Sequence, residues 1–167
     1  TEGMILNVGD YQDRNKYLVR TLEIINTMEN MVQEILTISR MKSSKVGLKR
    51  ETFQLSDILK QEYALFEDLI IQKSIDWNEN ISPDLSAIGD KALIQKVINN
   101  LISNAISYSP EGSTIYLTAF EEDGAVKFML ENTGVHIPDS EIPKLFDAFY
   151  RVEHSRNKKT GGSGLGL

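Results

Sequence analysis

Apolar side chains recur at intervals of three and four residues along the first part of the chain. Between Asn15 and Ser43 there is no glycine or proline, and this spacing predicts one long α-helix with a single apolar face. The face is narrow and flanked by charged residues, which is typical of a helical bundle or coiled-coil seam. An ordinary surface helix packed on its own domain is the alternative. The apolar positions are Leu18, Leu22, Ile25, Met28, Val32, Ile35 and Ile38.

The periodicity changes near residue 45, which divides the chain into a helical segment, 1–45, and a second unit, 46–167. In the second unit we expect a helix from Asp90 to Tyr108, stopped by a Ser-Pro-Glu-Gly turn. An Asp-Gly pair between two later apolar runs predicts a hairpin. The other expected elements are strands at 48–53, 74–81, 114–121 and 126–131, a short segment at 86–89, and helices at 57–72, with Ser56 as N-cap, and 140–146.

These elements predict an α+β sandwich in which helices cover one face of a mixed or mostly antiparallel sheet. Composition then narrows the function classes. The 18 Lys and Arg residues are outnumbered by 24 Asp and Glu, and no basic stretch alternates with aromatic residues, so nucleic-acid binding is not expected. The absence of cysteine excludes disulfides and thiolate metal sites. No apolar run approaches the ~18 residues of a membrane span, so no membrane contact is expected for this segment.

Three asparagines interrupt the apolar pattern of the helix expected at 90–108. Each of Asn99, Asn100 and Asn104 costs about 0.6 kcal/mol relative to alanine in a helix interior, which calls for an explanation. Asn100 and Asn104 are four residues apart and share a face, where two amide oxygens suit a hard cation that also contacts phosphate oxygens. Solvent-exposed polar residues are the alternative.

Two further segments are candidates for nucleotide binding. Asn132 follows a strand directly, so its side chain is a candidate reader of a base edge, with an ordinary Asx turn as the alternative. The glycines within 161–166 allow backbone N–H groups to approach an anion, although the same run also suits a flexible linker. Basic residues such as Arg151 precede it and suit a triphosphate. His136 and His154 have no adjacent orienting carboxylate, so neither is expected to be catalytic.

Four segments in this order resemble the ATP-binding domain of two-component sensor histidine kinases, which has the Bergerat-type (GHKL) nucleotide fold. Each motif is weak alone, but all four in order are specific. The resemblance covers 46–167, while the helix at 15–43 resembles the second helix of the dimerisation hairpin. The segments are 100–110 for the asparagine box, 132–137 for the first glycine box, 146–151 for the phenylalanine box and 162–166 for the second glycine box.

The resemblance implies a histidine kinase that uses ATP and Mg²⁺, with Asn100 as the metal ligand. It implies transfer of phosphate to a histidine of the dimerisation domain, relay to a response regulator, and a homodimer formed through the helix at 15–43. The segment would be cytoplasmic and its parent protein would lie in the bacterial cell membrane. The residues implied to bind nucleotide are Asn100, Asn104, Tyr108, Asn132, Gly134, Ile137, Phe149, Arg151, Gly162, Gly164, Leu165 and Gly166.

Three positions depart from the family pattern. Asn132 stands where the adenine-reading aspartate is common, and its amide accepts from the adenine amino group but, once flipped, also matches guanine. Ser107 removes a frequent phosphate-facing charge, and His136 replaces a glycine. A degraded nucleotide site that serves dimerisation and partner docking is therefore the alternative. A chaperone- or topoisomerase-type ATPase is not favoured, because 90–108 contains no glutamate to activate water.

The resemblance also bears on the ends of the chain and on the subgroup. It implies that the phosphoacceptor histidine lies upstream of Thr1, so that this segment alone cannot autophosphorylate. It also implies that the C-terminal helix of the domain is absent from these residues. The sequences at 131–134 and 149–153 are similar to those of Gram-positive sensor kinases, including the vancomycin-resistance sensor group.

Overall fold

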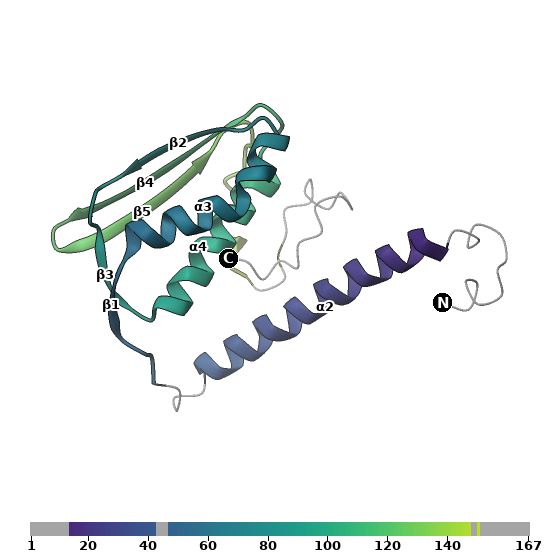
Figure 1. Cartoon of the computed structure of the whole chain (residues 1–167), viewed down its shortest axis with the longest axis horizontal. Coiled ribbons are helices and arrows are strands. Elements are labelled where there is room, and N and C mark those ends of the chain that lie inside the picture. The colour runs from purple at the N-terminus through teal and green to yellow at the C-terminus, as the bar shows by residue number, and fades with distance from the viewer. Residues whose placement is uncertain (1–13, 43–46, 148–149, 151–167) are drawn as a thin grey trace. The chain divides into compact units, whose positions relative to one another are not determined.

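The structure, a computed structural model, describes residues 14–42, 47–147 and 150 (Figure 1). The chain divides into two compact units, Thr1–Val46 and Gly47–Leu167. None of the helices in the described ranges is both long and apolar enough to cross a lipid bilayer.

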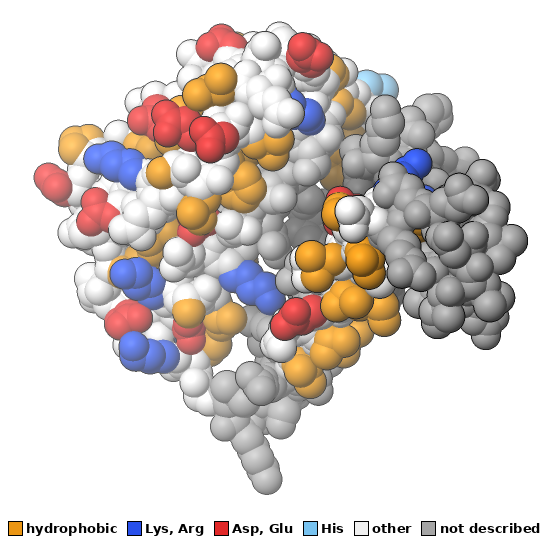
Figure 2. Space-filling view, turned by 45° about the vertical axis from the view of Figure 1, so that its right-hand side comes forward, with side chains coloured by type: hydrophobic (Ala, Val, Ile, Leu, Met, Phe, Trp, Pro, Cys, Tyr) orange, Lys and Arg blue, Asp and Glu red, His pale blue; other side chains and the backbone are white. Residues whose placement is uncertain are grey.

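Helix α2 of the first unit spans Arg14–Lys42, one residue earlier at each end than expected. Its large apolar side chains are exposed, from 42% for Leu36 to 60% for Met28, and they gather along the helix surface in Figure 2. The helix therefore has an apolar surface that the described residues of its own unit do not cover. The exposed apolar residues are Leu18, Val19, Leu22, Ile24, Ile25, Met28, Val32, Ile35 and Leu36.

The described residues of the second unit, 47–147 and 150, form two sheets and the helices α3 and α4. Strands β2, β4 and β5 form one sheet in which β2 is parallel and β5 antiparallel to the central β4, and β1 pairs with β3 in a separate antiparallel ribbon. Helices α3 and α4 lie on the same side of the three-stranded sheet (Figure 1). The elements are β1 Glu51–Gln54, α3 Leu55–Gln72, β2 Asp76–Ile81, β3 Ser86–Gly89, α4 Lys91–Tyr108, β4 Thr114–Glu122, β5 Ala125–Asn132 and the 3-10 turn η2 Ile142–Lys144.

The core lies between the helices and this sheet. On β4 the residues of one face, Ile115, Leu117 and Ala119, are at most 1% exposed, while Tyr116 on the other face is 46% exposed. This alternation matches the two-residue period of a strand. On α4 the buried residues Ile98 and Ile102 recur at the four-residue spacing of one helix face. The predicted α+β architecture, with helices on one face of a mixed sheet, is confirmed.

The predicted hairpin is also confirmed. Strands β4 and β5 pair from Ile115↔Asn132 to Glu122↔Ala125, which leaves Asp123 and Gly124 as the turn. Both turn residues have positive φ, 54° and 74°, as a two-residue hairpin turn of the primed type requires.

Three local predictions were wrong. Ser56 does not cap α3, because β1 runs directly into the helix at Leu55 and the Leu55 N–H donates to the Leu85 carbonyl, 2.7 Å away. The strand expected at 48–53 begins only at Glu51. The helix expected at 140–146 is reduced to the 3-10 turn η2, Ile142–Lys144.

Candidate nucleotide site

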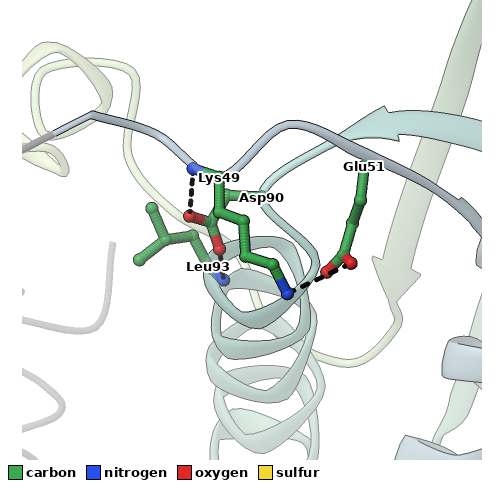
Figure 3. A network of polar contacts seen from close by, with 4 residues as sticks. All are labelled: Lys49, Glu51, Asp90 and Leu93. Atoms are coloured by element: carbon green, nitrogen blue, oxygen red, sulfur yellow. Dashed lines mark hydrogen bonds and ion pairs between the residues drawn. The ribbon is translucent and has the colours of Figure 1, made fainter.

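Helix α4 is preceded by its N-cap residue Asp90, whose carboxylate makes two contacts (Figure 3). One oxygen caps the helix by accepting from the Leu93 N–H at 3.3 Å, and the other accepts from the Lys49 N–H at 3.1 Å. The Lys49 side chain forms an exposed ion pair with Glu51 at 3.3 Å. The segment that enters the second unit is therefore attached to the first turn of α4, and this contact replaces the strand expected to start at Leu48.

The three asparagines of α4 lie on two different faces. Asn99 donates to the buried carboxylate of Glu62 on α3, with Nδ2 and Oε2 2.7 Å apart. Successive side chains of a helix are about 100° apart, so Asn100 points away from that contact and shares a second face with Asn104. Both of these asparagines are half-buried. Asn99 thus contacts α3, while Asn100 and Asn104 lie together on the other face.

The C-terminal end of α4 is held by Lys73, which follows α3. Its ammonium donates to the carbonyl oxygens of Ile106 at 2.6 Å, Ser109 at 3.0 Å and Ser107 at 3.4 Å. A cation at the C-terminus of a helix is favourable because it faces unpaired carbonyls and the negative end of the helix dipole. Lys73 therefore fixes the backbone on both sides of Tyr108.

The loop after β5 lies against this end of α4. The Thr133 N–H donates to the Thr114 carbonyl at 2.9 Å, and its hydroxyl accepts from the Thr114 N–H at 2.9 Å. Gly134 then has φ of 84°, and a β-carbon there would lie 3.1 and 3.2 Å from Cγ and Cδ of Pro110. Only a glycine allows this approach without displacement. The first glycine motif and the end of the asparagine motif are thus in contact.

Some of the predicted site residues lie in the described part of the chain and the others lie outside it. Asn100, Asn104, Tyr108 and Asn132 are half-buried, while Ile137 is 40% exposed. Tyr150 of the phenylalanine motif is described, and its ring centroid lies 5.8 Å from the Lys144 ammonium. The residues that lie outside the described part of the chain are Phe149, Arg151, Gly162, Gly164, Leu165 and Gly166.

The sequence interpretation did not identify Glu62 and Lys73 as residues that support the site. A signal for Glu62 was present, because it occupies a core position of the α3 stripe that also includes Leu55, Ile58 and Leu59. No comparable signal exists for Lys73, whose partners lie more than thirty residues further along the chain.

Comparison with known proteins identifies the class of protein that this chain resembles. Residues 89–167 match the family described as histidine kinase-, DNA gyrase B-, and HSP90-like ATPase. The sensor protein VanSB of Enterococcus faecalis is 32% identical over 168 residues, 99% of this chain and 37% of that protein. VanSC of Enterococcus gallinarum is 36% identical over 154 residues, 92% of this chain and 42% of that protein. The chain thus spans less than half the length of these relatives.

Comparison with solved structures leads to the same class of protein. Histidine kinase ThkA, in its complex with response regulator protein TrrA, superposes with a TM-score of 0.72 at 28% identity, covering 89% of this chain and 43% of that one. The second unit is therefore an ATPase domain of the GHKL type, which implies nucleotide use. Over nearly its whole length the chain is similar to sensor histidine kinases, as its motifs led us to expect.

Proposed function

We propose that the second unit binds ATP between the face of α4 that carries Asn100 and Asn104 and the loop after β5. The contact between Pro110 and Gly134 supports this most, because it brings the Tyr108 end of α4 beside the loop that begins at Asn132. The full set of proposed nucleotide-binding residues is Asn100, Asn104, Tyr108, Asn132, Gly134, Ile137, Phe149, Arg151, Gly162, Gly164, Leu165 and Gly166.

The base is proposed to face Asn132. This residue ends β5, pairs with Ile115 across the ladder and is half-buried, so its position is set by the sheet. Its amide oxygen accepts a hydrogen bond from the adenine amino group. Because the same amide can turn its NH₂ group toward a carbonyl oxygen, the proposal includes a weaker discrimination against guanine than a carboxylate would give.

The phosphates are proposed to bind together with Mg²⁺, for which Asn100 supplies an amide oxygen. Hard cations of this kind take few protein ligands when phosphate oxygens and water complete the shell. Among the described residues no group of three or more His, Cys, Asp or Glu side chains is placed to hold a metal. A cation shared between Asn100 and the nucleotide fits this donor set, and when bound it neutralises phosphate charge.

For the whole protein we propose histidine kinase activity. An imidazole nitrogen of a histidine on the dimerisation hairpin forms a bond to the γ-phosphorus, the bond from that phosphorus to ADP breaks, and the phosphoryl group then passes to a response regulator. The ThkA complex with TrrA supports a regulator as the partner. The second unit would contribute positioning and charge neutralisation without a covalent intermediate of its own.

The first unit is proposed to form the homodimer through the helix at 15–43, with residues 1–45 as the end of the dimerisation hairpin and 46–167 as the catalytic domain. The exposed apolar surface of α2 supports this role, because burying it against a second helix is worth roughly 25 cal/mol per Å². The segment is proposed to lie on the cytoplasmic side of a protein of the bacterial cell membrane.

One observation favours the alternative of a degraded site. Ser107 is exposed where a phosphate-facing charge is common, and Lys73 does not replace that charge because three carbonyls occupy its ammonium. A binding module that dimerises and docks partners without nucleotide would follow if this loss abolished binding.

Calorimetric titration separates the two proposals. ATP, ADP and GTP are titrated with and without Mg²⁺ into the chain and into Asn100→Ala, Asn104→Ala and Asn80→Ala variants. Asn80 is an exposed asparagine on β2 and serves as the control. We expect Mg²⁺-dependent, adenine-selective binding that falls by about tenfold or more in the two α4 variants, equivalent to ~1.4 kcal/mol or more. Absence of binding by the folded wild type favours the docking module.

A further inference from the structure

Glu62 is a buried carboxylate between α3 and α4. It is 1% exposed, and each of its oxygens accepts one hydrogen bond from a side-chain amide of α4. Gln95 Nε2 lies 2.8 Å from Oε1, and Asn99 Nδ2 lies 2.7 Å from Oε2. Within the described residues, no lysine or arginine forms an ion pair with it. In this part of the chain the carboxylate is therefore held by two neutral amides.

Stability alone does not account for a carboxylate at this position. The preceding turn of α3 buries Ile58 and Leu59, so an apolar side chain at 62 would continue the same core stripe. Burying an ionised group is costly, and replacing such a group together with its polar partners by apolar groups of similar shape is often neutral or stabilising. What the carboxylate adds is a fixed hydrogen-bond direction. An ionised carboxyl group has two acceptor oxygens and no donor, so the α4 side chains must donate to it.

The two bonds fix α4 relative to α3. Gln95 and Asn99 are one turn apart, so bonds from both to one rigid carboxylate set the rotation of α4 about its axis as well as its shift along it. A rotation of roughly 10° moves a side-chain end that lies ~5 Å from the helix axis by about 1 Å. Misplacement by about 1 Å is enough to cost ~100-fold in a positioned reaction.

We propose that Glu62 is a positioning residue of the nucleotide site. Through Gln95 and Asn99 it holds α4 in the rotational setting that presents Asn100 and Asn104 to the Mg²⁺-bound phosphates. This inference rests on the proposed ATP site and deepens it by assigning the α3–α4 contact to ligand positioning.

Three substitutions isolate the direction of the hydrogen bonds. Glu62→Gln keeps the shape but turns one acceptor into a donor that faces an amide donor. Glu62→Met keeps the volume and removes both acceptors. The double variant E62Q/Q95E restores both bonds, because the amide introduced at position 62 then donates to the carboxylate at position 95 and accepts from Asn99. Glu67→Gln, on the exposed side of α3, is the matched control.

Two readouts are measured on the whole chain: the affinity for Mg²⁺-ATP and the ¹H–¹⁵N signals of the Asn100 and Asn104 side-chain amides without nucleotide. We expect about a tenfold loss of affinity in both single variants, with recovery to within about threefold in the double variant and no loss in Glu67→Gln. Gln95 and Asn99 are half-buried, so water takes the place of the carboxylate as their acceptor in Glu62→Met, and the urea midpoint should stay near that of the wild type. This result separates positioning from stability. The two amide signals should shift in the single variants and return in the double variant.

The outcomes distinguish this inference from the proposed function. If the wild type binds Mg²⁺-ATP and Glu62→Met binds it equally well with unshifted amide signals, the positioning role is wrong and the ATP site stands. If the wild type binds no nucleotide but the amide signals shift and recover as expected, the ATP site is wrong while the control of α4 by Glu62 is supported.

Discussion

Gly134 lies so close to Pro110 that a β-carbon on the glycine would be 3.1 Å from Cγ of the proline ring. Such a separation is too short for ordinary van der Waals contact, and the glycine also has a φ of 84°. The loop after β5 can therefore approach the end of α4 only with glycine at this position. This contact joins the end of the asparagine motif to the first glycine motif, which are distant in the sequence.

Gly134→Ala should weaken both the fold and the nucleotide site. A non-glycine residue with left-handed φ costs about 1–2 kcal/mol, and displacement of Pro110 adds to this. We expect a loss of about 1–3 kcal/mol in the free energy of unfolding by urea, together with weaker ATP binding. Gly124→Ala is the control, because Gly124 has a φ of 74° in the hairpin turn but nothing within 4 Å of an added β-carbon. Equal ATP affinity in both variants would contradict the role of the contact.

Lys73→Met should destabilise the second unit. The substitution leaves the carbonyls of Ile106 and Ser109 without their charged donor, and hydrogen bonds to a charged group are worth about 1–3 kcal/mol. The free energy of unfolding from urea titration should fall by that amount. Lys60→Met, which replaces an exposed lysine on α3, should change it by no more than about 0.5 kcal/mol. A Lys73 variant as stable as the Lys60 variant would show that water replaces the ammonium at no cost.

Asp90 variants should separate the cap from the attachment of the entering segment. Asp90→Ala removes both contacts and should cost about 0.5–2 kcal/mol. Asp90→Asn keeps an oxygen for the Leu93 N–H but presents NH₂ to the Lys49 N–H. In hydrogen exchange, both amides should therefore exchange faster in the alanine variant, and only that of Lys49 in the asparagine variant. Unchanged exchange at Lys49 in both would mean that the Asp90 contact does not protect it.

Elements with a strong local signal could be predicted from the sequence. Helix α4 follows from its apolar period and the Ser-Pro-Glu-Gly turn that ends it, and the β4–β5 hairpin follows from Asp123 and Gly124. The start of α3 could not be predicted, because the Leu55 N–H is satisfied by Leu85 from another segment and needs no side-chain cap. Contacts of this kind depend on which segments the fold brings together, and no local pattern encodes them.

The same limit applies to the site. Asn99, Asn100 and Asn104 stood out as polar residues in an apolar helix, but only the structure shows that Asn99 is bonded to Glu62 of α3. The support by Lys73 and the approach of Pro110 to Gly134 likewise join residues that are distant in the sequence. Motif spacing identified candidate ligands, while the residues that hold them in position required the structure.

Ile25→Glu should dissociate the proposed dimer. The substitution places a charge in the apolar stripe of α2, where Ile25 is 52% exposed in the single chain. Burying that charge against a second helix would be strongly unfavourable. Thr27→Glu adds the same charge on the opposite side of the helix and serves as the control. Sedimentation equilibrium should give a dimer for the wild type and the control and a monomer for Ile25→Glu. A monomeric wild type at all concentrations would refute the proposed interface.

The central claim is that Asn100 and Asn132 hold opposite ends of an ATP molecule. A crystal structure of the chain with Mg²⁺ and a non-hydrolysable ATP analogue tests it most directly. We expect the Asn100 amide oxygen at about 2.1 Å from Mg²⁺ and the Asn132 side chain within hydrogen-bond distance of the adenine amino group. A nucleotide bound away from α4, or one that leaves both asparagines without contact, would contradict the account.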